Sequence, residues 1–276
     1  MIKIMVDTGS DCRKAKHVYD YIVPLSVTIG ENTYLDGVDL EVDQFYDLLT
    51  GSEDFPKTAQ PSPQAFADIF DQVKADGDEL IYFSISSQIS GTYQSANVAK
   101  DMVEYDKIYI VDTLSATHCI RYLAEYAKKC IAEGLSAEEI VERCEELKKH
   151  VKVIVGLDTL EFLYKGGRLS KTSATVGGLV GIKPIVTLVE EGKVESIGKA
   201  LRRNKAMDFI VKQMETMGVD ESFPVYSIFS YGEDNCVRFE DTLAKNGIAV
   251  QDRLQLGATI GTHTGPGVFG TVFVSK

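Results

Sequence analysis

A strand, a helix and a second strand follow one another between residues 79 and 113. ELIYFSI at 79–85 is a mostly apolar run, TYQSANVAKDMVEY at 92–105 has a helical pattern, and KIYIVDT at 107–113 is strand-like again. Two strands joined by a helical crossover lie parallel in one sheet. The order therefore predicts a parallel sheet covered by helices, which places the chain in the α/β class.

Strands and helices continue on both sides of this unit. Apolar residues recur at helical spacing after residue 62, and Ser136 with Glu139 matches a capping box. The predicted strands and hairpins cover 2–6, 23–37, 151–157, 183–197, 224–230, 248–256 and 268–274. The predicted helices cover 42–51, the second half of 52–77, 116–133, 136–150, 158–167, 203–217 and 233–246. The first half of 52–77 and the stretch 260–267 are predicted loops.

The length and the change of pattern after His150 predict two α/β domains. A chain of 276 residues is long enough for two domains of ordinary size. We expect an N-terminal, Rossmann-like domain with a parallel sheet over 1–150, and a C-terminal domain with a mixed sheet over 151–276. No flexible linker marks the boundary between them.

Charge and cysteine usage narrow the function classes. The net charge of −12 and the pI of about 4.9 argue against nucleic acid and anionic membranes as partners, because phosphate neutralisation needs a basic face. No stretch approaches the length of a membrane span, and the N-terminal apolar run is too short for a signal peptide. The five cysteines form no C-x-x-C pair, so we expect free thiols in a cytoplasmic protein.

A hydroxyl-rich loop follows the strand at 79–85. The segment FSISSQISGTYQSA at 83–96 holds six serine and threonine side chains and no lysine or arginine. Ser87, Ser90 and the amides beside Gly91 meet the start of a helix, where unsatisfied N–H groups and the positive dipole end favour an anion. The segment lacks the P-loop and G-x-G-x-x-G patterns. It therefore suits an anion of single charge, or else Ser90 simply caps the helix.

Two further stretches carry similar chemistry. PKTAQPS places Thr58 and Gln60 between two prolines, and IGTHTGPG places His263 in a glycine-rich loop without charges. An imidazole there can donate to a carboxylate and titrate near neutrality. The alternative is a structural turn whose histidine bonds to the backbone.

Three kinds of catalytic site can be compared with the sequence: an aspartic-protease site, a serine-hydrolase triad and a metal centre. DTGSD at Asp7 looks like an aspartic-protease motif, but those enzymes need two facing aspartates and this chain has a single copy. Asp7 is instead expected to end a strand, where it caps a turn or meets the edge of a ligand. Ser90, His263 and Asp112 remain open as a hydrolase triad, although no G-x-S-x-G elbow is present. The scattered histidines predict no metal site.

Taken together, the motifs resemble the DegV family. They are TAQPS, SSQISGTYQSA, LEFLYKGGRLS and GTHTGPG, in that order over nearly the whole chain, with DTGSD and PLSVTIGENTYLDG before them. The resemblance implies two α/β domains, with a C-terminal domain that encloses a long-chain fatty acid. It also implies that the protein is the fatty-acid-binding subunit of a fatty acid kinase. By motif, the carboxylate ligands are Thr58, Ser90, the Gly91 amide and His263.

The chain departs from the family pattern at two places. Ala59 stands where serine is more common, and Leu201 takes the place of an arginine, with Arg202 and Arg203 beside it. The resemblance makes Arg168, Arg202 and Arg203 candidate contacts for a partner or a phosphate. Together with the lysines at 165, 171 and 199, these arginines either form a local positive face for a partner or an acyl phosphate, or are ordinary solvated surface residues. The small residues of SATVGGLVGI at 173–182 either let an acyl chain pass between packed elements or allow close backbone packing.

These observations predict a cytoplasmic fatty-acid-binding protein that is not an enzyme by itself. It would present the carboxylate to a separate kinase for acyl-phosphate formation and phospholipid synthesis. Its ligand would be the fatty acid, with no cofactor or metal, and it would have no nucleic-acid partner and no integral membrane association. The alternatives are a serine hydrolase acting on a small ester or acyl substrate, and a regulatory module with the same fold.

Overall fold

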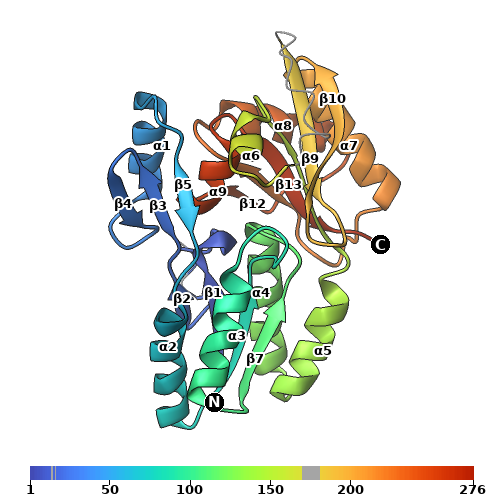
Figure 1. The fold of residues 1–276 in the computed structure, drawn as a ribbon. Coiled ribbons are helices and arrows are strands. Elements are labelled where there is room, and N and C mark those ends of the chain that lie inside the picture. The colour runs from blue at the N-terminus through green and yellow to red at the C-terminus, as the bar shows by residue number, and fades with distance from the viewer. Residues whose placement is uncertain (14, 16, 170–180) are drawn as a thin grey trace.

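The computed structural model describes residues 1–13, 15, 17–169 and 181–276. Its N-terminal half is built on a four-stranded parallel sheet in the order β2-β1-β6-β7 (Figure 1). The predicted strand–helix–strand unit is confirmed as β6, α3 and β7. The bounds in this half are β1 Ile2–Asp7, β2 Tyr21–Val23, β6 Glu79–Ser84, β7 Ile108–Asp112, α2 Pro63–Asp76, α3 Thr92–Val103, α4 His118–Ala132 and α5 Ala137–Leu147.

Helices cover both faces of this sheet because its strands alternate apolar side chains between the two faces. Met5 and Tyr82 pack with the apolar face of α2 and α3, and Ile4 and Phe83 pack with α4 and α5. Local signals set the helix ends. Ser136 forms the predicted capping box with Glu139 at the start of α5.

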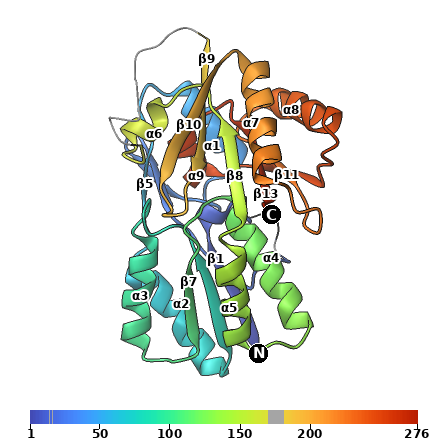
Figure 2. The ribbon, with the colours of Figure 1, turned by 90° about the vertical axis from the view of Figure 1, so that its right-hand side faces the viewer.

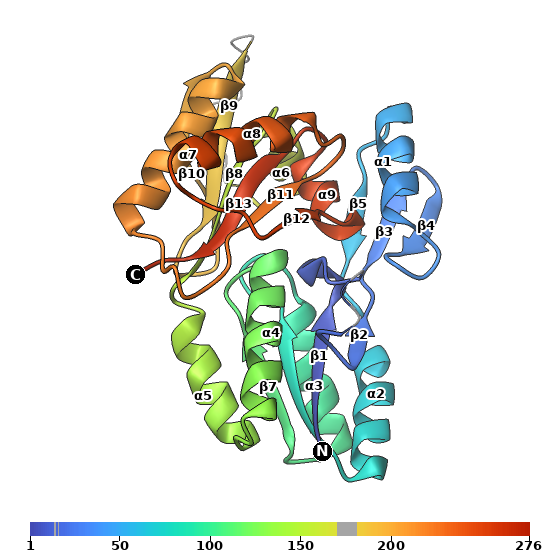
Figure 3. The same cartoon turned by 180° about the vertical axis from the view of Figure 1, so that it is seen from behind.

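A second, three-stranded sheet in the order β4-β3-β5 lies beside the C-terminal half rather than in the parallel sheet (Figures 1 and 3). Its hairpin turns at Gly30, as predicted, but the loop predicted over the first half of 52–77 contains a strand that pairs with β3. Its bounds and those of the helix packed on it are β3 Ser26–Ile29, β4 Asn32–Leu35, β5 Lys57–Ala59 and α1 Val42–Gly51.

The C-terminal half contains a six-stranded mixed sheet in the order β10-β9-β8-β13-β11-β12. Only β11 and β12 pair in parallel among its described strands. The prediction of α/β architecture with a parallel sheet and a separate mixed sheet is therefore confirmed. The bounds are β8 Val151–Gly156, β9 Ile182–Leu188, β10 Val194–Leu201, β11 Tyr226–Phe229, β12 Asp252–Gln255, β13 Phe269–Val274, α6 Glu161–Lys165, α7 Arg203–Met217, α8 Asp234–Lys245 and α9 Ala258–Thr264.

Two sequence predictions in this half were wrong. The loop predicted at 260–267 is largely the helix α9, and the strand predicted at 248–256 is reduced to β12. The helix forms despite its glycines because its first amides are held by carboxylates from the N-terminal half. Lys171 and residues 173–180 of the small-residue segment lie outside the described residues.

The two faces of the C-terminal sheet have different neighbours. Side chains such as Ile154 and Ile185 pack under α7 and α8, which cover the outer face (Figure 2). Val153 and Val272, which face the other way, share one core with α4 of the N-terminal half. The halves are thus joined through a continuous apolar layer. The division at residue 150 stays a prediction, although β8 does begin at Val151.

All five cysteines are buried and free, as predicted. Within the described ranges, no helix has both the length and the apolar character needed to cross a membrane.

Candidate functional site

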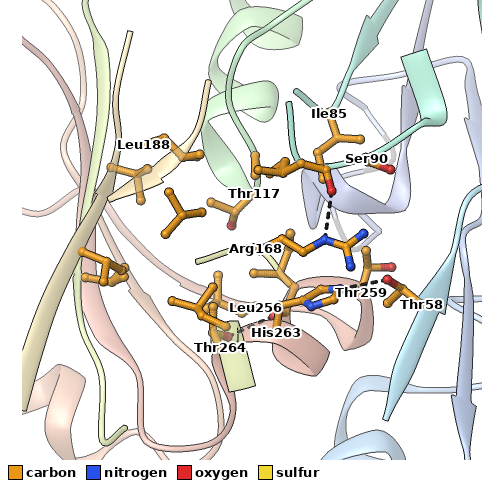
Figure 4. A pocket seen from close by; sticks show the side chains of 18 of the residues that line it. Thr58, Ile85, Ser90, Thr117, Arg168, Leu188, Leu256, Thr259, His263 and Thr264 are labelled. Atoms are coloured by element: carbon orange, nitrogen blue, oxygen red, sulfur yellow. Dashed lines mark hydrogen bonds between the residues drawn. The ribbon is translucent and has the colours of Figure 1, made fainter. Parts of the chain in front are cut away.

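A largely apolar cavity of about 90 Å³ lies in the layer between the two halves (Figure 4). This is several times the roughly 10–15 Å³ that one water needs. Its apolar lining comes from strands, helices and loops of both halves: Leu25, Ile85, Ile89, Ala116, Val153, Val155, Leu163, Val186, Leu188, Val194, Ile228, Leu256 and Ile260. Its polar lining consists of Thr58, Ser90, Thr117, Arg168, Thr187, Thr259, His263 and Thr264.

Thr58 and His263 meet at one end of this cavity. The Thr58 hydroxyl and His263 Nε2 are 2.8 Å apart and share a hydrogen bond, although the residues are 205 positions apart in the sequence. β5 presents the threonine and the last turn of α9 presents the histidine. His263 Nδ1 is buried and has no partner among the described residues. A β-carbon built on Gly166 would lie 2.3 Å from this nitrogen, so it packs against the Gly166 backbone.

The imidazole of His263 is neutral in this environment. Burial, and then the positive charge of Arg168, lower the pKa of His263 to about 3. A neutral ring has one N–H donor and one acceptor nitrogen. At neutral pH it can therefore share a hydrogen bond with a ligand, whereas the positive charge at this end of the cavity comes from Arg168.

Ser90 reaches the cavity from the loop before α3. Its hydroxyl lies 2.7 Å from that of Thr92 and accepts a bond of 3.4 Å from the Thr92 amide. The N-cap residue of α3 is nevertheless Gly91. Ser90 thus contacts the first turn of the helix without being its N-cap residue, and it lines the cavity. Its role as an anion ligand stays a prediction.

Gly91 is required by the close approach of Gln60. A β-carbon on Gly91 would lie 1.8 Å from Gln60 Oε1, and the Gln60 amide donates to the Ser95 hydroxyl at 2.8 Å. This contact ties the segment after β5 to the first turns of α3. It thereby fixes the position of Thr58 relative to Ser90.

Arg168 is the member of the predicted arginine set that lines the cavity. Its guanidinium donates to the Ile89 carbonyl at 3.0 Å and to the Gly166 carbonyl at 2.6 Å. Burial lowers its pKa. Its remaining donors can face a ligand (Figure 4).

Arg202 and Arg203 lie elsewhere, at the junction of β10 and α7. Arg203 pairs with both carboxylate oxygens of Asp158, at 2.9 and 3.0 Å, beside Lys183. Arg202 is exposed and adopts a positive φ of 72°. Neither is among the described residues that line the cavity.

The predicted hydrolase triad is not assembled. The Asp112 carboxylate accepts from the amides of Ser87 and Leu114, at 3.2 and 3.1 Å. His263 Nε2 is paired with Thr58 instead. Within the described part of the chain, no acid orients the histidine, so the structure does not support this alternative.

Asp7 caps a turn, which was one of the two roles predicted for it. It accepts from the Gly9 amide at 2.8 Å, the Ile85 amide at 2.9 Å and the Tyr82 hydroxyl at 2.7 Å. Burial raises its pKa to about 6. As for metals, the described ranges contain no group of three or more His, Cys, Asp or Glu side chains that could hold an ion.

Sequence reasoning missed the residues that hold α9 in place. The Asp11 carboxylate accepts from the Gly257 amide at 2.8 Å, and Asp36 accepts from the amide and hydroxyl of Thr259 at 3.0 and 2.6 Å. Burial raises the pKa of both carboxyls. Thr259 also lines the cavity. Asp11 lies in the motif DTGSD and Asp36 in PLSVTIGENTYLDG. Neither aspartate was predicted to bind α9.

Two α/β layers that enclose an apolar cavity, with hydroxyl, imidazole and guanidinium groups at one end, define the molecule as a protein built to surround a small amphipathic ligand. The family model described as "Uncharacterised protein, DegV family" matches residues 1–276. The chain belongs to the DegV family, as its motifs predicted.

Known relatives match the chain over its whole length. A DegV domain-containing protein of Caldanaerobacter subterraneus is 33% identical, with coverage of 100% of this chain and 99% of the relative. A solved structure titled as fatty acid binding of a DegV family protein from Thermus thermophilus has a TM-score of 0.88 and 30% identity, covering 100% and 99% of the two chains. A fatty acid binding DegV family protein from Streptococcus agalactiae has a TM-score of 0.90 and 28% identity, with the same coverage.

Proposed function

We propose that this protein binds a long-chain fatty acid between its two halves. The observation that carries the proposal is the cavity itself, whose apolar lining ends at the group formed by Thr58, Ser90, His263 and Arg168. The acyl chain occupies the apolar part and the carboxylate lies at the polar end. The fatty acid binding named for the Thermus thermophilus and Streptococcus agalactiae relatives supports the same ligand class.

The polar groups suit one carboxylate. The hydroxyls of Thr58 and Ser90 and the Gly91 amide donate hydrogen bonds without adding charge, and His263 contributes a ring N–H or accepts one. Arg168 supplies a single positive charge near the headgroup. Hydrogen bonds to a charged group contribute about 1.5–3 kcal/mol each, so this end of the cavity fixes the orientation of the ligand.

The tail supplies most of the binding energy. Each buried methylene contributes about 0.8 kcal/mol, so roughly 14 methylenes contribute about 11 kcal/mol before costs. The loss of translational freedom and the ordering of the tail offset a large part of this. Affinity therefore depends on the apolar wall, and the polar end decides which way the ligand enters.

The bound acid is held for a separate kinase, and the protein itself does not perform the phosphoryl transfer. This part of the proposal rests on the DegV resemblance and on neutral donors that leave the carboxylate oxygens reactive. Arg168 contacts the carboxylate or the new acyl phosphate, and Arg202 and Arg203 contact the partner. The compartment that fits these roles is the cytoplasm.

Lipid analysis of the purified protein tests the binding function. Protein from bacterial cells is denatured and its organic extract examined by mass spectrometry, and delipidated protein is titrated with hexadecanoic acid and with its methyl ester. We expect about one acid per chain and weaker binding of the ester, which lacks the charge. A clean extract together with no saturable binding of the acid would overturn the proposal.

The arginine roles need a separate assay. Arg168→Ala, Arg202→Ala and Arg203→Ala are compared in acyl-phosphate formation with a cognate kinase, using Arg238→Ala on α8 as the matched control. We expect reduced turnover in the first three variants and normal turnover in the control. Equal turnover in all four would remove the arginines from the proposal.

A further inference from the structure

A second cavity adjoins the first and shares two wall residues with it. Val153 and Leu188 line the cavity described above and also a neighbouring cavity of about 310 Å³. The second cavity is bounded by Leu114, Val151 and Val189, among others, at the junction of the two halves. Two side chains that face both spaces form the wall between them.

These residues belong to a row that crosses three strands. β8 and β9 pair with Ile154 opposite Thr187, so continuing the register by one residue brings Val153 opposite Leu188. Leu188 in turn pairs with Val194 on β10. Residues paired across neighbouring strands point to the same side of a sheet. All three side chains accordingly line the cavity. The row is therefore a continuous apolar ridge across the sheet.

The row stands far from the polar end. Thr58 and His263 come from β5 and α9, whereas the row lies on β8, β9 and β10. Figure 4 shows Leu188 across the cavity from Thr58. A fatty acid whose carboxylate is held at the polar end would therefore direct its methyl end towards the row.

The chemistry of the second cavity suits a hydrocarbon end better than a second headgroup. Its three lysines already have partners: Lys148 pairs with Glu145, Lys149 pairs with Glu146, and Lys152 donates to the Lys149 carbonyl. The other polar residues of its lining are Thr113, Ser115 and Glu190. Lysine stems cover apolar surface while their charged ends stay in water. The apolar groups Leu114, Val151 and Val189 are then left to contact an acyl chain.

We propose that Val153 and Leu188 set the acyl chain length, and that the second cavity receives the methyl end of the longer chains. The inference rests on the proposed function and adds a specificity element to it. Chains that end before the row fill the first cavity alone. Longer chains must pass between the two side chains, so the size of these side chains decides how many methylenes are bound.

Competition among chain lengths tests this assignment. Delipidated protein is equilibrated with an equimolar mixture of saturated fatty acids of about 12 to 22 carbons, a range that brackets the acid of roughly 14 methylenes considered above. The bound acids are then measured by mass spectrometry. Leu188→Ala should shift binding to longer acids and Leu188→Phe to shorter ones. The expected change is roughly fourfold per methylene gained or excluded. Val153→Leu is a milder narrowing variant should the phenylalanine variant fail to fold.

Leu254→Ala is the matched control, because Leu254 is buried on the same sheet face and is not among the described residues lining either cavity. It should keep the wild-type length profile. Wild-type profiles in the loaded Leu188 and Val153 variants would overturn the inference and leave the proposed function intact. Wild-type protein that binds no acid at all would overturn both.

Discussion

Gln60 and Gly91 lie so close together that a β-carbon at position 91 would stand 1.8 Å from the Gln60 Oε1 atom. The two residues come from different motifs, one after β5 and one at the start of α3. Their contact holds together two of the segments that supply polar groups to the cavity.

Gly91→Ala should destabilise the protein by about 1–3 kcal/mol, the usual cost of adding atoms to a packed site. The backbone of Gly91 is at a φ of −78°, so the cost would come from the clash and not from the dihedral angle. Urea unfolding measures it. Gly51→Ala is the control, since a β-carbon there meets nothing within 4 Å.

The double variant Gln60→Ala with Gly91→Ala separates the clash from other effects. Removing the Gln60 carboxamide should recover most of the stability lost by Gly91→Ala, because contacting residues are not additive. If the stability lost in the double variant equals the sum of the losses in Gln60→Ala and Gly91→Ala, the contact with Gln60 does not explain why position 91 is a glycine.

Thr58→Val should weaken fatty acid binding by roughly 10–100-fold, because it removes a hydroxyl at the carboxylate position and leaves His263 Nε2 without its partner. The affinity for the methyl ester should fall less than the affinity for the acid, since the ester headgroup carries no charge. Isothermal titration of both ligands gives the two numbers. Thr28→Val on the neighbouring strand β3 should bind the acid normally, and equal losses in both valine variants would contradict the assignment.

Acid should destabilise the ligand-free protein through His263 and His118. Burial lowers the pKa of each from 6.5 to about 3. Between these values the unfolded chain binds more protons at each histidine than the folded chain, so the contribution of the two histidines to stability rises with pH across this window. Burial raises the pKa of Asp7, Asp11 and Asp36, which acts in the opposite direction. Denaturant unfolding from pH 7.5 down to 4.5 therefore measures the histidine contribution as the difference between the wild type and each histidine variant, about 1–3 kcal/mol per histidine.

Substituting these histidines provides the check. His263→Gln and His118→Gln should each lose the histidine contribution, so that stability falls less, or rises more, than in the wild type as the pH drops from 6.5 to 4.5. A second measurement follows the His263 ring by NMR, and it should remain neutral at pH 5. A ring that titrates near 6.5 would contradict the buried environment described for it.

Asp36→Ala should cost about 3–5 kcal/mol, because it removes the buried carboxylate that pairs with Arg13 and accepts from the amide and hydroxyl of Thr259. Among the carboxylates that the structure describes, Arg13 then keeps only its ion pair with Glu41. Since α9 carries His263, fatty acid affinity should fall as well. The control is Asp39→Ala, whose carboxylate accepts one exposed amide bond, and which should cost less than about 1 kcal/mol. Similar losses in the two variants would show that Asp36 does not anchor α9.

Local signals allowed much of the fold to be predicted. The alternation at 79–113, the capping box at Ser136 and the hairpin turn at Gly30 each depend on residues a few positions apart. The confirmed elements are of this kind. Thr58, Ser90 and His263 were singled out from composition and motif, and the structure places all three on one cavity. Their role as carboxylate ligands remains a prediction.

The tertiary structure alone decided the pairing of Thr58 with His263, the helical form of α9 and the row at Val153 and Leu188. β5 becomes a strand because β3 offers it an edge, and α9 is held as a helix by Asp11 and Asp36 from more than 200 residues away. Short-range propensity favours turns in such glycine-rich segments. Hydrogen bonds and packing between distant residues override that preference, and they cannot be read from neighbouring positions in the chain.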